Sequence, residues 1–109
     1  MAFLLTLPAP AISQDANTFG TGNTFLSHCG DELRDECVIY SVGVWHGAMT
    51  MTSLVEPIVC FPSGVTGGQL FRVGINFMRD NPDKGHWKPA ELLVMSWAEA
   101  FPCQPGQKP

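Results

Sequence analysis

The chain has 109 residues and a formal net charge of −4, with 45% hydrophobic and 15% charged residues. This length suits a single domain, and the composition is typical of a globular chain rather than a disordered one. The negative balance argues against a nucleic-acid or anionic-membrane partner, because both require a basic face, and it would suit a basic protein partner.

The first residues, MAFLLTLPAPAISQDA, do not have the pattern of a folded element. Ala2 to Leu7 is apolar but far shorter than the roughly 20 residues of a membrane span. Small residues follow at the spacing of a signal-peptidase site, in Ala9-Pro10-Ala11 and again in Ala11-Ile12-Ser13. We interpret residues 1–13 as the remnant of a secretory signal peptide that has lost its basic start. A merely flexible N-terminus is the alternative.

The four cysteines point to an exported protein. They are Cys29, Cys37, Cys60 and Cys103. An even number in a small exported chain predicts a disulfide framework, for which three pairings exist. Zinc is the competing interpretation, but the sequence has no C-x-x-C knuckle and no paired histidines.

The domain begins with a polar segment from Gln14 to Asn23 and a short helix that ends at Cys29. Phe25, Leu26 and Cys29 share one face of this helix, and Thr21 or Asn23 is its expected N-terminal cap. Gly30 would close it, as glycine does just past a helix end.

An acidic turn, Asp31 to Glu36, precedes the second helix, which we expect in the segment CVIYSVGVWHGAMTM (37–51). Its apolar residues recur at helical spacing at Val38, Val42, Trp45 and Met49. Alternating β-branched residues would also permit a strand, but 15 residues is long for one. A loop of about ten residues, Thr50 to Val59, should follow.

The third helix should start at a capping box, in which Thr66 and Gln69 satisfy each other's backbone amides. Its expected apolar stripe is Leu70, Val73, Gly74, Phe77 and Met78. Asn81-Pro82 should end it, because the residue before a proline avoids helical geometry. The glycines from Gly64 to Gly68 match neither phosphate-binding pattern, G-x-G-x-x-G or G-x-x-x-x-G-K-[ST], so we interpret them as a helix start.

The fourth helix shows the clearest amphipathic pattern. Pro89 suits its first position, and Pro102 should stop it just before Cys103. The expected inward residues are Ala90, Leu93, Val94, Trp97, Ala98 and Phe101. We expect residues 104–109 to form a flexible tail.

These elements predict an all-α domain over residues 14–103, a small disulfide-stapled four-helix domain made of two antiparallel helical hairpins. In that arrangement Cys29 lies near Cys37 and Cys60 lies near Cys103, so the pairing 29–37 with 60–103 is favoured. Pairings that link the two hairpins, such as 37–60 with 29–103, stay open.

No catalytic constellation is visible, and we expect no enzyme activity, cofactor or metal. His28, His46 and His86 are single histidines in different segments, and Ser41, Ser53 and Ser63 lack a nucleophile-elbow context. A small enzyme that uses Gly64–Gly68 as an anion site remains as a remote alternative. The acidic turn is best explained as a solvated turn that complements the helix dipole, or as a negative surface for a basic partner.

The ordered set of motifs resembles the Rap/Tai family of small exported immunity proteins. The matching segments are GNTFLSHC (22–29), CVIYSVGV (37–44), CFPSGVTGGQL (60–70), NP (81–82), PAELLV (89–94) and AFPC (100–103). This resemblance implies an all-helical, disulfide-containing periplasmic protein that binds and inhibits a cell-wall amidase effector delivered by type VI secretion. It also implies a possible homodimer.

The resemblance assigns no inhibitory residues, so we place the expected partner contact by position alone. It comprises Asp31, Glu32, Asp35 and Glu36 in the acidic turn and Thr52, Ser53 and Glu56 in the following loop. The competing interpretation is a periplasmic helical binding or chaperone-like protein with no effector partner.

Overall fold

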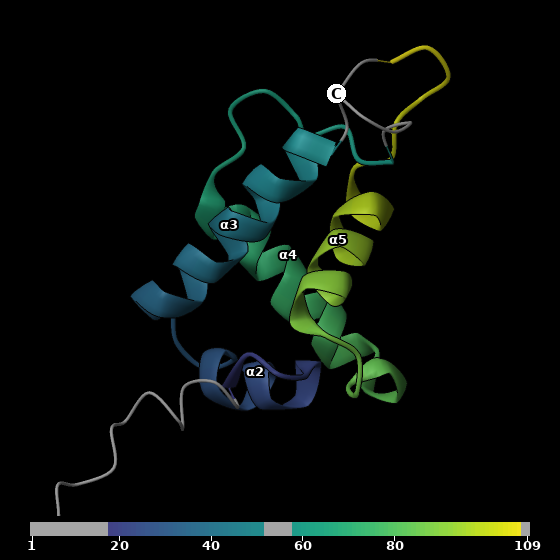
Figure 1. Cartoon of the computed structure of the whole chain (residues 1–109). Coiled ribbons are helices and arrows are strands. Elements are labelled where there is room, and N and C mark those ends of the chain that lie inside the picture. Colours follow the sequence, from purple (N-terminus) through teal and green to yellow (C-terminus); the bar gives the residue numbers. More distant parts are fainter. Residues whose placement is uncertain (1–17, 52–57, 108–109) are drawn as a thin grey trace, which may run out of the picture.

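The computed structural model describes residues 18–51 and 58–107, which form four α-helices and one short 3₁₀ helix (Figure 1). The helices are α2 (Gly22–Cys29), α3 (Asp35–Met51), α4 (Gly67–Asp80), η1 (Pro82–Lys84) and α5 (Pro89–Ala100). Within those residues no strand forms, and the single antiparallel bridge joins Val59 to Pro102. The all-α class is therefore confirmed. The expected signal remnant (1–13) and the end of the tail lie outside the described residues.

Helix α2 begins at a capping box formed by Thr21 and Thr24. The sequence analysis had named Thr21 as one of two candidate caps but had not identified the box. The Thr21 hydroxyl accepts a hydrogen bond from the amide of Thr24 at 3.2 Å, and the Thr24 side chain accepts one from the amide of Thr21. At the other end, Gly30 closes the helix as expected: it is the C-cap, and its amide donates to the carbonyl oxygen of Leu26 at 2.8 Å, with a right-handed backbone (φ −72°). A side chain at Gly30 would place its Cβ 2.5 Å from the carbonyl oxygen of Leu26, so close packing explains why a glycine stands there.

Helix α3 confirms the preference for helix over strand, and it starts two residues earlier than expected, at Asp35. Its buried residues are Cys37 and Ser41, whereas Met49, which the stripe pattern placed inside, is 50% exposed. The expected stripe is therefore only partly buried. Because α3 carries apolar residues around most of its circumference, periodicity alone could not fix its inner face.

Helices α4 and α5 form the main antiparallel pair of the fold. Thr66 caps α4 through the expected box with Gln69, and Pro89 opens α5. The indole N–H of the fully buried Trp97 donates to the carbonyl oxygen of Leu70 at 2.9 Å, which ties the two helices together across the core. A buried indole that keeps a partner avoids a desolvation cost of about 1–3 kcal/mol.

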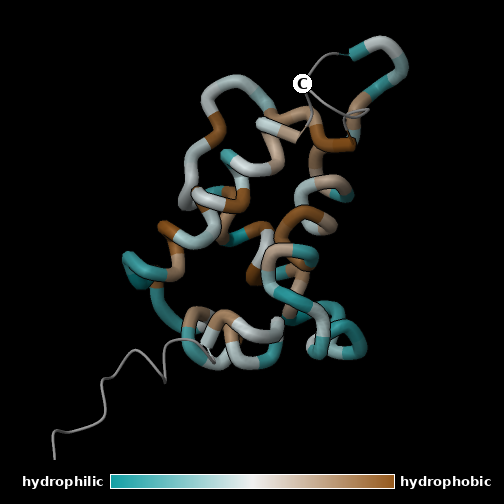
Figure 2. Tube along the Cα trace, in the orientation of Figure 1, coloured by the Kyte–Doolittle hydropathy of each residue, from teal (hydrophilic) through white to brown (hydrophobic). Residues whose placement is uncertain are grey.

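The short helix α2 packs mainly against α4, while α3 contacts both α4 and α5 (Figure 1). The first two helices are thus joined at a corner rather than packed along each other, which differs in detail from the hairpin expected for them. Figure 2 shows hydrophilic stretches at this corner and around η1, and hydrophobic ones where the helices meet. The buried core comprises Phe25, Cys29, Cys37, Val59, Leu70, Phe71, Ile75, Met78, Leu92, Leu93 and Trp97.

The four cysteines form two disulfides, and no described cysteine is free. Cys29 is bonded to Cys37 with a Cα–Cα distance of 5.9 Å, and Cys60 to Cys103 with a Cα–Cα distance of 4.9 Å. The first bridge fixes the corner between α2 and α3. The second fastens the segment before α4 to the chain just after α5.

Candidate partner-binding surface

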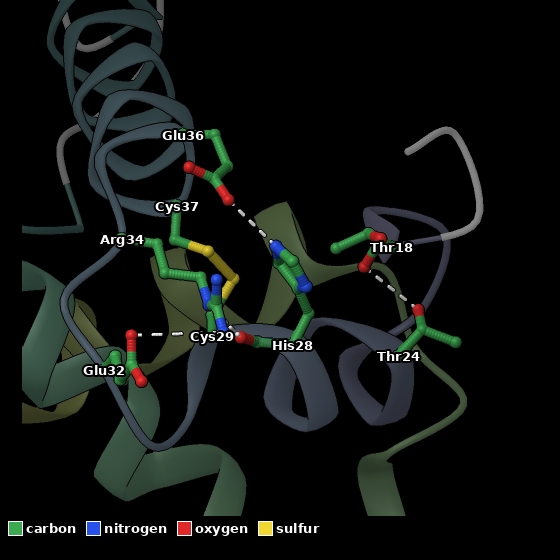
Figure 3. Close-up of a disulfide and its surroundings, with 8 residues drawn as sticks. All are labelled: Thr18, Thr24, His28, Cys29, Glu32, Arg34, Glu36 and Cys37. Carbon is green, nitrogen blue, oxygen red and sulfur yellow. Dashed lines mark hydrogen bonds and ion pairs between the residues drawn. A yellow bond between two sulfur atoms is a disulfide. The ribbon is translucent and has the colours of Figure 1, made fainter. Parts of the chain in front are cut away.

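The corner between α2 and α3 holds the acidic residues that the sequence singled out, and Figure 3 shows two of them, Glu32 and Glu36. The Cys29–Cys37 disulfide lies beneath it, with both cysteines at most 1% exposed. This bridge holds the last turn of α2 against the first turn of α3, so it fixes the positions from which the side chains of the corner extend.

His28 and Glu36 meet across this corner. Their Nε2 and Oε1 atoms are 2.9 Å apart, and both side chains are more than one-third exposed. The hydrogen bond from His28 is the main reason why the pKa of the Glu36 carboxyl lies below its ordinary value of 4.5, and the backbone hydrogen bond at Glu36 acts in the same direction.

Arginines also approach the other carboxylates of the turn. The guanidinium of Arg34 donates to the carbonyl oxygen of His28 at 3.1 Å and lies 3.9 Å from Glu32 (Figure 3). Arg79, from α4, donates to the carbonyl oxygen of Gly30 and lies 4.0 Å from Asp31. Exposed pairs of this kind contribute about 0–1 kcal/mol each, but they place positive groups among the carboxylates.

The expected contact residues therefore lie in a mixed-charge surface. Asp31, Glu32, Asp35 and Glu36 are all exposed at one corner, interleaved with Arg34 and Arg79. A partner would meet alternating charges there rather than a uniformly negative patch. Thr52, Ser53 and Glu56 lie outside the described residues, so their expected role stays a prediction.

The corner also contains a group of atoms with the spacing of metal ligands: His28, Glu36 and Cys37 lie within 4.8 Å of one another. The Cys37 sulfur is already bonded to Cys29. Metal ligation by cysteine requires a thiolate, so this sulfur is not available, and a histidine with one carboxylate is a poor zinc set.

Two surface hollows meet at Arg72, a residue that the sequence analysis did not single out. The Asp31 hollow, about 320 Å³, lies between the acidic turn and α4 and includes Asp31, Leu33, Ile75 and Arg79. The Phe101 hollow, about 490 Å³, lies between the segment 62–65, α4 and Phe101. The signal for Arg72 was its spacing of seven residues from Arg79, which places both on the solvent side of α4.

Among the described residues, the candidate catalytic side chains do not assemble. Ser41 is 1% exposed, and its hydroxyl has no hydrogen-bond partner among the described residues. The rings of His46 and His86 pack beside Trp45 and Trp87, their own neighbours in sequence. Within residues 18–51 and 58–107 no serine or cysteine forms a hydrogen bond with a histidine, and the Thr66 hydroxyl occupies the start of α4 where an anion would bind.

These features define a small, disulfide-bridged, all-helical domain whose distinctive chemistry lies on its outer surface. The family model of Rap1a immunity proteins matches residues 21–103. The chain therefore belongs to the Rap1a immunity protein family, which confirms the resemblance found in the sequence. No curated protein and no solved structure matches the chain. Within the described residues, no helix combines the length and the hydropathy that a membrane crossing requires.

Proposed function

We propose that this protein is a periplasmic immunity protein that binds and inhibits a peptidoglycan amidase effector of type VI secretion, without enzymatic activity of its own. The observation that carries the proposal is the family match, which spans all four helices and both disulfides. Immunity proteins act by binding a protein effector, and a rigid scaffold reduces the entropy lost on binding.

The two disulfides support the proposed location. Disulfides form and persist in oxidising compartments such as the bacterial periplasm. An amidase that cleaves peptidoglycan would act in the same compartment, so inhibitor and effector would meet there.

The test uses a purified peptidoglycan amidase effector of type VI secretion, chosen from the same genome as this protein. The purified protein should bind that amidase with a nanomolar Kd. Inhibition of peptidoglycan hydrolysis should be complete once one molar equivalent of the protein has been added. Co-expression in the periplasm should protect cells, whereas co-expression without an export signal should not. Absence of binding and of inhibition would overturn the proposal. The homodimer that the resemblance implies is tested by sedimentation velocity of the isolated protein.

A second candidate is a periplasmic chaperone-like protein that binds apolar clients. It is favoured by large apolar side chains that stand in solvent on α3 and just before α4: Ile39 is 69% exposed, Met51 52% and Ile58 61%. Large exposed apolar side chains offer contacts to an apolar client. Under this alternative the protein should suppress light scattering by an aggregating client at low pH. Lack of protection would count against it.

A further inference from the structure

We propose that the Phe101 hollow, with Arg72 at its edge, is the surface that receives the effector, and that its occupant is a protein loop carrying an apolar side chain next to a carboxylate. This inference rests on the proposed function and names the chemistry of the partner at one surface. The residues that carry it are Pro62, Gly64, Val65, Arg72, Val73 and Phe101.

Arg72 differs from the other two arginines of the chain. Arg34 and Arg79 each donate to a backbone carbonyl oxygen and lie within 4.0 Å of a carboxylate. Arg72 is exposed on α4 and has no hydrogen bond or ion pair among the described residues. Its guanidinium is therefore free to bind a carboxylate of a partner through two parallel hydrogen bonds.

The charges around Arg72 decide which hollow receives that carboxylate. The Asp31 hollow contains Asp31 and Glu32, which would repel it. Among the described residues that line the Phe101 hollow none is acidic, and Arg72 is the only charged one. In a chain with a net charge of −4, this makes the Phe101 hollow a local site for negative charge.

The remaining lining explains why the occupant also needs an apolar group. Pro62, Val65, Val73 and Phe101 provide most of the wall, and Gly64 lies in open space. An apolar side chain in a hollow of about 490 Å³ would be removed from water while its neighbouring carboxylate reaches Arg72. Such a pairing of an apolar anchor with an arginine is typical of the energetic centre of a protein interface.

The walls of the hollow are held in place before any partner arrives. The Cys60–Cys103 disulfide and a 2.9 Å hydrogen bond from the Cys60 amide to the Phe101 carbonyl oxygen fasten one side. On the other side, a turn is closed by the Val65 amide, which donates to Pro62 at 3.2 Å. Gly64 occupies its third position with φ +83°, which favours glycine. A preformed site binds with less loss of conformational entropy.

The experiment measures binding of the amidase used to test the proposed function, by isothermal titration calorimetry. Arg72→Glu should weaken binding about 100-fold, because it replaces an attraction by a repulsion in a desolvated contact. Arg72→Lys should weaken it about 10-fold, because lysine cannot form the two-pronged contact. The matched control is Lys88→Glu at the start of α5, which makes the same change in net charge and should alter binding by less than about threefold.

Two further measurements make the outcome independent of folding effects. Thermal unfolding of each variant should match the unaltered protein, because Arg72 is exposed. In the unaltered complex, hydrogen exchange should slow in the segment 63–74 and at Phe101. If the unaltered protein binds but Arg72→Glu equals Lys88→Glu, or if protection falls elsewhere, this inference alone is overturned. If the unaltered protein does not bind the amidase, the proposed function and this inference fall together.

Discussion

The two disulfides stabilise two chemically different ends of the molecule. Cys29 and Cys37 are only 8 residues apart in sequence and lie beneath an exposed corner of ion pairs. Cys60 and Cys103 are 43 residues apart, and their neighbours are apolar, including the fully buried Val59. The first bridge orients two consecutive helices. The second closes a loop that contains both α4 and α5.

The two bridges therefore have different roles: the Cys29–Cys37 bridge orients α2 and α3, whereas the Cys60–Cys103 bridge contributes mainly to stability. At the Cys60–Cys103 end, Phe61 packs edge-on against Trp97 with ring centroids 5.7 Å apart, and Trp97 reaches Leu70 through its indole N–H. Covalent closure, aromatic packing and a buried hydrogen bond therefore act on the same helix pair. At the other end, exposed charges add little to stability but fix the surface that a partner would meet.

The largest expected difference between the ends comes from removing each bridge. Cys60→Ala with Cys103→Ala should lower the free energy of unfolding by about 4 kcal/mol, against about 2.5 kcal/mol for Cys29→Ala with Cys37→Ala, because the longer loop restricts the unfolded chain more. Urea denaturation followed by circular dichroism measures both. Equal costs, or the reverse order, would show that packing around the Cys29–Cys37 corner matters more than loop length.

A matched pair of glycine substitutions should give the next largest difference. A Cβ at Gly74 would lie 2.3 Å from a methyl carbon of Leu93, so Gly74→Ala should destabilise the protein by about 1–3 kcal/mol by separating α4 from α5. At Gly43, on α3, nothing lies within 4 Å. Gly43→Ala should therefore stabilise by up to about 1 kcal/mol through helix propensity alone. Thermal unfolding measures both, and a stabilising Gly74→Ala would contradict the close contact.

The local signals in the sequence predicted the element boundaries well. Thr66 and Gln69, Pro89 and the Asn81-Pro82 pair act within a few residues of themselves, so their effect does not depend on the rest of the fold. The inner faces were harder to predict. Phe71 and Ile75 are buried although the expected stripe omitted them, because α4 contacts α2, α3 and α5 and its buried arc is wider than a stripe.

The candidate site could be predicted only in part for a related reason. The acidic turn is contiguous in sequence, so its exposure at one corner followed from composition. Arg79 reaches Gly30, just before that turn, from 49 residues away, and the Phe101 hollow is built from three separate segments. Such arrangements depend on how the helices pack, which the spacing of residues within one helix does not determine.

The smallest expected effect concerns the ion pair at the corner. Because the folded-state pKa of Glu36 lies below 4.5, its carboxylate stabilises the folded protein above that pH, and the contribution is lost as pH falls through the folded-state value. Glu36→Gln should therefore be less stable than the unaltered protein at pH 6, and the difference should shrink as the pH falls below 4.5. Urea denaturation at a series of pH values measures the difference.

The control for this prediction is the same substitution in a protein that lacks the histidine. In a His28→Gln background, Glu36→Gln should lose most of its pH-dependent cost, because the His28 hydrogen bond is the largest cause of the lowered pKa. The backbone hydrogen bond at Glu36 would leave a smaller remainder. A pH-dependent cost that persists unchanged without His28 would assign the stabilisation to the first turn of α3 rather than to the contact between the helices, because acidic side chains there also interact with the helix dipole.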